Sequence, residues 1–203
     1  MFKKELSVQE LFSIAYLYLL ALGILSDALF YGVLGVSYLS FTTVLDALIS
    51  PVSMLTNNYL VSLVLIVGFV LMYLHIVKLT PYMYRKFKEK KWYRKMNNME
   101  KAEKRMKALE KKDNIYKAMA FFFFLLFISV RLGMGLGTKR KIQKLKHTPN
   151  YTITFTDNTS IDVARIGQNS IYIFYVKEGE QVVTATPIMD NVKEIKRIKK
   201  LGE

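Results

Sequence analysis

The sequence contains no cysteine. Disulfide frameworks, thiolate metal sites and cysteine nucleophiles are therefore excluded, and the redox compartment is left open. Histidine is scarce too, since there are only His75 and His147 and neither has a second ligand at metal-binding spacing. The sequence also lacks a G-x-S-x-G elbow and a GxxxxGK[ST] phosphate loop. We therefore expect no enzyme activity, no metal site and no cofactor.

Positive charge is missing from a long N-terminal stretch, because neither lysine nor arginine occurs between Lys4 and Lys78. Only four charged residues, all acidic, interrupt this stretch: Glu5, Glu10, Asp27 and Asp46. From Lys78 onward the chain is strongly basic, and its formal net charge is +14. An apolar part followed by a cationic part is typical of a membrane protein. The excess of basic residues is explained by the positive charge that membrane proteins retain at their cytoplasmic face. The alternative explanation is that these residues bind nucleic acid.

Two apolar stretches of this part predict membrane helices. The first runs from about residue 11 to 34, and Ser7 with Glu10 forms a capping-box pattern before it. The second, 59–77, reads YLVSLVLIVGFVLMYLHIV and carries no formal charge. Its nineteen residues cross roughly 30 Å of hydrocarbon at ~1.5 Å each, and Pro81 marks the exit.

The residues between these stretches, 35–58, predict a short helix in place of another span. Ser40 caps this helix, which extends to Ile49 and is stopped by Pro51. Its polar interruptions suit an interfacial or re-entrant segment.

The segment 78–117 holds fifteen Lys or Arg against five Asp or Glu, a net charge of +10. The positive-inside rule places it in the cytoplasm. Asn97 and Asn98 predict the turn of a helical hairpin. A seam with 3-4-3 spacing follows and serves either packing within the hairpin or a short coiled coil: Met99, Ala102, Met106 and Leu109.

A third apolar stretch covers residues 118–138 and contains FFFFLLFISV followed by Arg131. It is long enough to cross the membrane. Its apolar residues, each contributing about −0.3 to −0.6 kcal/mol to the free energy of insertion, also outweigh the cost of one arginine. A full crossing would place the five basic residues that follow this stretch outside the cytoplasm, against the positive-inside rule. A re-entrant segment that bends at the glycines is therefore the alternative. These glycines suit close helix packing or a helix break: Gly133, Gly135 and Gly137.

The composition changes after His147, where short β-branched and aromatic runs alternate with turn residues. Four strands of an antiparallel meander are predicted: 151–155, 160–166, 170–177 and 181–188. A short basic helix is expected to follow, capped by Asp190 or Asn191, with inward-facing Val192, Ile195 and Ile198. Because so small a unit is barely stable alone, we expect it to pack against the membrane region or a neighbouring copy.

Asp27 and Arg131 are the candidate functional residues of the apolar part. A charge in hydrocarbon costs about 2.5–3.5 kcal/mol on insertion scales, so it faces a bundle interior, a partner charge or water. Asp27 either lies at the outer interface after a tilted helix, or lines a pore, or pairs with Arg131. Asp46 is a weaker candidate, because its short segment need not enter the hydrocarbon.

Basic residues mixed with aromatic ones are the candidate surface contacts. They suit an aromatic belt with anionic lipid, or alternatively the stacking of single-stranded nucleic acid. These residues are Arg85, Lys86, Trp92, Arg94, Lys139, Arg140 and Lys141.

Residues 25–51, LSDALFYGVLGVSYLSFTTVLDALISP, resemble a group of small, uncharacterised bacterial multi-span membrane proteins. Those share an Asp in the first span, a Tyr-Gly followed by Leu-Gly, and a Leu-Asp-x-Leu-Ile-Ser-Pro ending. The similarity continues into the glycine run and IYIFYVKEGE, but it implies no biochemical role. In layout the chain is similar to membrane effectors of bacterial antiphage defence. That likeness implies an oligomer that perturbs the membrane once a nucleotide signal changes.

We therefore expect an α-helical membrane protein with about three transmembrane helices, followed by a small antiparallel β meander and a short terminal helix. Its parts are a transmembrane hairpin with an interfacial helix (1–80), a basic cytoplasmic hairpin (81–117), a third transmembrane or re-entrant helix (118–138) and the β unit with its helix (148–203).

The leading functional hypothesis is an oligomeric effector or channel-like protein of the bacterial inner membrane, whose β unit senses a ligand or drives assembly. The alternative is a non-conducting scaffold that binds anionic lipid, nucleic acid or a partner protein. Expected partners are the lipid bilayer, further copies of the chain, a nucleotide or nucleic-acid ligand, and a protein encoded nearby.

Overall fold

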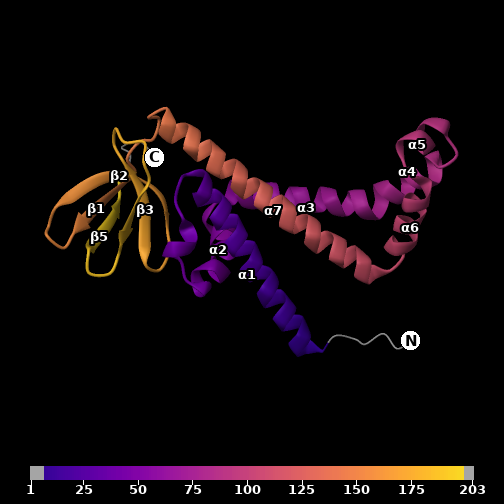
Figure 1. The fold of residues 1–203 in the computed structure, drawn as a ribbon, viewed down its shortest axis with the longest axis horizontal. Coiled ribbons are helices and arrows are strands. Elements are labelled where there is room, and N and C mark those ends of the chain that lie inside the picture. The colour runs from indigo at the N-terminus through magenta and orange to yellow at the C-terminus, as the bar shows by residue number, and fades with distance from the viewer. Residues whose placement is uncertain (1–6, 199–203) are drawn as a thin grey trace. The chain divides into compact units, whose positions relative to one another are not determined.

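Three long apolar helices dominate the computed structural model, which describes residues 7–198 (Figure 1). They are Val8–Val33 (α1), the continuous helix Tyr59–Phe87 and Lys112–Gln143 (α7). Each is long and apolar enough to cross a membrane, and only 22%, 11% and 17% of their most apolar windows are buried within the chain. Helices that leave so much apolar surface outside the fold are typical of membrane proteins. The predicted class, a helical membrane protein with a C-terminal antiparallel sheet, is confirmed.

The chain forms two compact units, one made of residues 1–53 and 128–203 and the other of residues 54–127. The first unit contains α1, the end of α7 and the sheet. The second contains the helix Tyr59–Phe87 and the basic segment.

In the first unit, α1 begins as predicted with a capping box, in which the Ser7 and Glu10 side chains and backbone N–H groups bond reciprocally. After it come a 3-10 turn, Tyr38–Phe41 (η1), and a helix, Val44–Asn57 (α2). Thr43 precedes α2 and its hydroxyl accepts a hydrogen bond from the N–H of Asp46 (3.1 Å). The prediction that Ser40 caps this helix is therefore wrong.

The prediction that Pro51 stops this helix is also wrong, since Pro51 lies inside α2. Proline has no N–H for the carbonyl four residues before it, which here belongs to Ala47. That carbonyl lies against α1 at Gly23, so closely that a Cβ on Gly23 would be 1.7 Å from the Ala47 oxygen. The close approach buries both Ala47 and Pro51 and stabilises the helix that proline would otherwise break.

In the second unit, the helix from Tyr59 to Phe87 consists of Tyr59–Leu74 (α3), a π turn at His75–Leu79 (η2) and Thr80–Phe87 (α4). The π turn precedes Pro81, which cannot donate a backbone hydrogen bond. In its place the backbone N–H of Thr80 donates to the carbonyl of His75, and the Thr80 hydroxyl donates to the same oxygen (2.9 Å). The helix therefore continues past Pro81.

Two shorter helices complete the basic segment, Lys91–Met96 (α5) and Met99–Leu109 (α6). The predicted turn at Asn97 and Asn98 separates them, and the Asn98 side chain caps α6. The four predicted seam residues are half-buried along α6, while the residues between them are exposed.

The C-terminal sheet contains five antiparallel strands in the order β4-β3-β2-β1-β5. They are Tyr151–Phe155 (β1), Ser160–Gln168 (β2), Tyr172–Lys177 (β3), Thr184–Pro187 (β4) and Val192–Arg197 (β5). The four predicted strands are thus present and pair as a meander. Four consecutive residues of β3 are buried, because both faces of the strand are covered. Ile173 and Tyr175 pack against side chains of the other strands, whereas Phe174 packs against α1 and η1.

The predicted terminal helix is wrong, because residues 192–197 form β5 beside β1. Residues 199–203 of that prediction lie outside the described part of the chain. The three-residue spacing of Val192 and Ile195 is typical of one face of a helix. In a strand, a bulge in the β1–β5 ladder also places two residues at this spacing on the same face. Phe155 pairs with Val192 and Thr154 with Glu194, so Lys193 is the extra residue. Val192 and Ile195 therefore both pack on the same core, as predicted, from a strand.

We predict that Gly23→Ala destabilises the first unit, because the new methyl group would overlap the Ala47 carbonyl. Overpacking of this kind costs about 1–3 kcal/mol, which thermal unfolding in detergent would register as a lower melting temperature. Gly32→Ala, in the same helix, is the matched control because a Cβ there has no atom within 4 Å. Equal melting temperatures for the two variants would contradict the close approach of α1 and α2.

Candidate functional site

An ion pair joins two of the apolar helices of the first unit. Asp27 on α1 accepts hydrogen bonds at one carboxylate oxygen from Nη2 (2.6 Å) and Nε (3.2 Å) of Arg131 on α7. The side chains are only 2% and 14% exposed. Counted at ~1.5 Å per residue from Ala118, Arg131 lies roughly 20 Å into the apolar stretch of α7. The structure thus brings together the two charged residues predicted to face the bundle interior.

Aromatic and polar side chains surround this pair. The Arg131 guanidinium carbon lies 3.9 Å from the ring centroid of Phe30, a cation–π contact. Ser26 is also buried, and its hydroxyl donates to the carbonyl of Gly23 (3.1 Å). Burial raises the pKa of Tyr38 to about 12, and the negative charge of Asp27 and a hydrogen bond to it act in the same direction. Tyr38 therefore stays a neutral hydrogen-bond donor beside the carboxylate.

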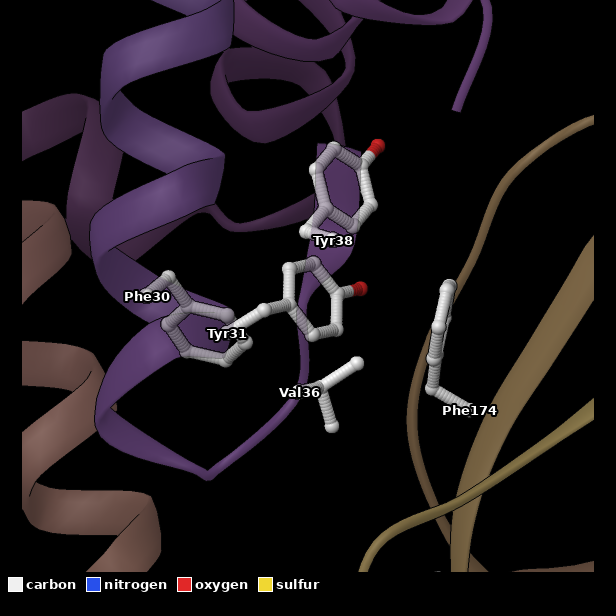
Figure 2. Close-up of a cluster of buried hydrophobic side chains, with 5 residues drawn as sticks. All are labelled: Phe30, Tyr31, Val36, Tyr38 and Phe174. Atoms are coloured by element: carbon white, nitrogen blue, oxygen red, sulfur yellow. The ribbon is translucent and has the colours of Figure 1, made fainter. Parts of the chain in front are cut away.

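The aromatic cluster is formed by Phe30, Tyr31, Val36, Tyr38 and Phe174 (Figure 2). It connects the ion pair to the sheet, because Phe30 contacts Arg131 and Phe174 belongs to β3. The Tyr31 and Tyr38 rings stack with their centroids 4.5 Å apart and an interplanar angle of 3°. Phe174 of β3 lies 4.7 Å from the Tyr31 ring, while Phe30 meets Tyr31 edge-on at 4.9 Å. Each ring in the series from Arg131 to Phe174 is thus in contact with the next.

Gly167 of β2 lies directly against the Tyr31 side chain of α1. A Cβ at this position would be 2.1 Å from the Tyr31 hydroxyl oxygen, so only glycine fits without a shift. The β2–β3 ladder changes register between Arg165 and Gly167, and this bulge provides the irregular backbone.

A second, polar junction attaches the turn between β2 and β3 to the start of α2. Asp46 accepts hydrogen bonds from the N–H and the hydroxyl of Ser170, both at 3.0 Å, and from the hydroxyl of Thr43 (2.7 Å). Asn169 donates to the carbonyl of Phe41 (2.7 Å). Partial burial alone would raise the pKa of Asp46, but the hydrogen bonds from Thr43 and Ser170 outweigh it and hold the pKa below its ordinary value. Asp46 is therefore a charged carboxylate within this junction.

The predicted packing glycines differ in their surroundings. At Gly135 a Cβ would lie 3.1 Å from the Phe30 carbonyl oxygen, so α1 and α7 approach closely there, next to the ion pair. At Gly133 and Gly137 a Cβ would have no neighbouring atom within 4 Å in the described part of the chain. Within residues 7–198, Gly135 is therefore the one glycine of the three that packs against another helix.

The predicted basic and aromatic contacts are all exposed, but they belong to different units. Arg85, Lys86, Trp92 and Arg94 lie on α4 and α5, whereas Lys139, Arg140 and Lys141 lie in the last turns of α7. Trp92 packs against the rings of Phe87 (5.3 Å) and Tyr93 (5.6 Å).

Sequence reasoning missed the aromatic cluster and the polar junction. Tyr31, Tyr38 and Phe174 look like ordinary apolar residues in their runs, and their stacking depends on the sheet folding back onto α1. Asp46 carried the available signal, since a carboxylate three residues after Thr43 is a helix-capping pattern. Within residues 7–198, no group of three or more His, Asp or Glu residues is placed to hold a metal ion.

We predict that Asp27→Asn lowers the free energy of unfolding by about 3–5 kcal/mol, because it leaves the Arg131 charge buried without a partner. Removing both charges in Asp27→Asn/Arg131→Met should restore much of this loss, as measured by a double-mutant cycle of thermal stability. Glu100→Gln is the control, because it breaks an exposed pair with Lys104 and should change little. If the losses of stability caused by Asp27→Asn alone and by Arg131→Met alone simply added up in the double variant, this would contradict a coupled buried pair.

Compared with protein-family models, with curated proteins and with solved structures, the chain matches none of them.

Proposed function

We propose that the chain is an oligomeric, channel-like effector of the membrane, with the C-terminal sheet as its sensing or assembly unit. The observation that carries this proposal is the buried Asp27–Arg131 ion pair, which is joined to the sheet through the aromatic cluster. Ionisable residues inside a membrane are costly and usually mark an ion pathway, a relay or a gate. A structural anchor alone would not need such a pair.

In the single chain the two charges neutralise each other, so this arrangement corresponds to a closed state of the proposed channel. A shift of α1 against α7 would separate them and expose polar groups between apolar helices. Movement of the sheet would transmit such a shift, because Phe174 contacts Tyr31 and Tyr38, and these adjoin Phe30 and Asp27. A ligand that binds the sheet differently in the two states would bias this equilibrium.

Several copies are needed, because three helices enclose no pore. Gly133 and Gly137 support assembly, since they form a G-x-x-x-G pattern on α7 and a Cβ at either would have no neighbouring atom within 4 Å among residues 7–198. Small residues at this spacing let membrane helices approach closely. The mostly exposed apolar surface of all three helices leaves room for such contacts. In a cell this assembly would permeabilise the membrane on a signal, as the likeness to defence effectors implies.

The contacts of the sheet support a full crossing by α7. Residues 34–58 contain no Lys or Arg, so the positive-inside rule favours the outer side for them. The sheet packs on this segment through Tyr38, Phe41 and Asp46. Moreover, α7 is an uninterrupted helix of 32 residues, or about 48 Å, through its three glycines. The sheet would then lie outside the cytoplasmic membrane, with residues 78–117 in the cytoplasm, and its ligand would not be a cytoplasmic nucleotide.

A non-conducting scaffold is the second candidate, and the exposed basic residues of α4 and α5 favour it. Such a protein would bind anionic lipid or nucleic acid through Arg85, Lys86, Trp92 and Arg94. Its binding would weaken steeply with salt.

We predict that the purified protein forms oligomers in nanodiscs and conducts ions in planar bilayers. Gly133→Leu/Gly137→Leu should abolish both properties by blocking close helix contact, whereas Gly32→Leu, also facing open space, should not. Asp27→Asn/Arg131→Met should assemble but conduct with altered ion selectivity. A monomeric wild type that never conducts across a range of pH and candidate ligands would eliminate the channel and leave the scaffold.

We predict that Glu178→Cys, an exposed position after β3, is labelled by a membrane-impermeant maleimide on intact cells. The absence of native cysteine makes the label specific. Lys101→Cys, in the basic segment, should react only after the cells are broken. Protection of both positions until lysis would instead support the re-entrant arrangement.

A further inference from the structure

The second unit contains a large groove between the helix Tyr59–Phe87 and the helices that pack on it. Its volume is about 1750 Å³, and it is lined from Gly68 to Lys86 along α3, the π turn and α4. This length of helix corresponds to about 27 Å. Met106 and Leu109 of α6 and Phe122 of α7 form the other wall.

The lining changes in character along the groove. Toward α3 it is apolar, with Gly68, Leu71 and Phe122 among the contributing residues. Toward α4 it carries the cations Lys78, Arg85 and Lys86, against a single carboxylate from Glu110. The groove is therefore amphipathic in the same sense as a phospholipid, with an apolar section inside the span and a cationic section at its end.

The cationic section is prepared for an anion. Lys86 donates to the Tyr82 hydroxyl (2.9 Å), and this contact holds its ammonium group at the groove. Among residues 7–198, Lys78 and Arg85 make no ion pair, so their charges remain available. Lys78 belongs to the π turn, a local geometry found frequently at functional sites.

We propose that this groove binds an anionic phospholipid of the cytoplasmic leaflet. The acyl chains lie along α3 and Phe122, and the phosphate group contacts Lys78, Arg85 and Lys86. Size supports this occupant, because pockets for small molecules measure about 300–1,000 Å³ and this groove is larger. Charge complementarity selects an anionic headgroup over a zwitterionic one. The proposal rests on the membrane insertion and orientation given above, but not on ion conduction.

Native mass spectrometry tests the proposal with full-length protein released from nanodiscs that contain equal parts of phosphatidylglycerol and phosphatidylcholine. The wild type should retain phosphatidylglycerol preferentially. Lys78→Gln/Arg85→Gln/Lys86→Gln should weaken that retention at least about tenfold, since each basic residue near the surface contributes roughly 1 kcal/mol. Lys90→Gln/Lys91→Gln/Lys95→Gln, at the start and on the face of α5, is the matched control, because it removes the same charge from exposed residues that do not line the groove.

An uncharged variant separates the groove from general attraction to the membrane surface. Leu71→Trp adds bulk to the apolar section and should reduce retention of phosphatidylglycerol while leaving the net charge unchanged. Equal loss in the two triple variants, or retention of both lipids alike, would overturn the groove and leave the proposed channel untouched. Failure of the wild type to float with vesicles would overturn both proposals.

Discussion

The pairing of Asp27 with Arg131 is the interaction on which the first unit depends, because neither charge can enter an apolar surrounding alone. An isolated charge there would cost several kcal/mol, and the 2.6 Å contact between the two side chains offsets this cost. It also fixes the register of α1 against α7, since Gly135 must then meet the backbone of Phe30. Phe30 contributes in turn by placing its ring over the Arg131 guanidinium.

The sheet is positioned by the same group of residues. Tyr31 and Tyr38 turn their rings toward Phe174, and Gly167 leaves space for the Tyr31 hydroxyl. Asp46 then holds the turn between β2 and β3 through Ser170. Because the apolar and polar junctions lie on neighbouring segments, the sheet is attached to α1, η1 and α2 together. A small sheet gains from this attachment the burial that its own five strands do not provide.

Two prolines show how apolar helices accommodate a missing backbone hydrogen bond. At Pro51 the carbonyl of Ala47, which proline deprives of its usual donor, faces the backbone of Gly23. At Pro81 a π turn moves the hydrogen bond to the preceding threonine. Both helices continue because a neighbouring group satisfies or shields the backbone. The π turn also contributes Lys78 to the groove of the second unit.

Three apolar helices, the capping box at Ser7, the turn at Asn97 and four strands could be predicted from the residues alone, since periodicity and local hydrogen bonding specify these features. Asp27 and Arg131 could also be singled out, because a charge within an apolar run is conspicuous. The folded chain was needed to show that these two residues meet, that Pro51 lies inside a helix and that Val192–Arg197 form a strand. Each of these depends on a neighbour distant in sequence: Arg131 for Asp27, Gly23 for the Ala47 carbonyl, and the bulged ladder with β1 for the terminal segment.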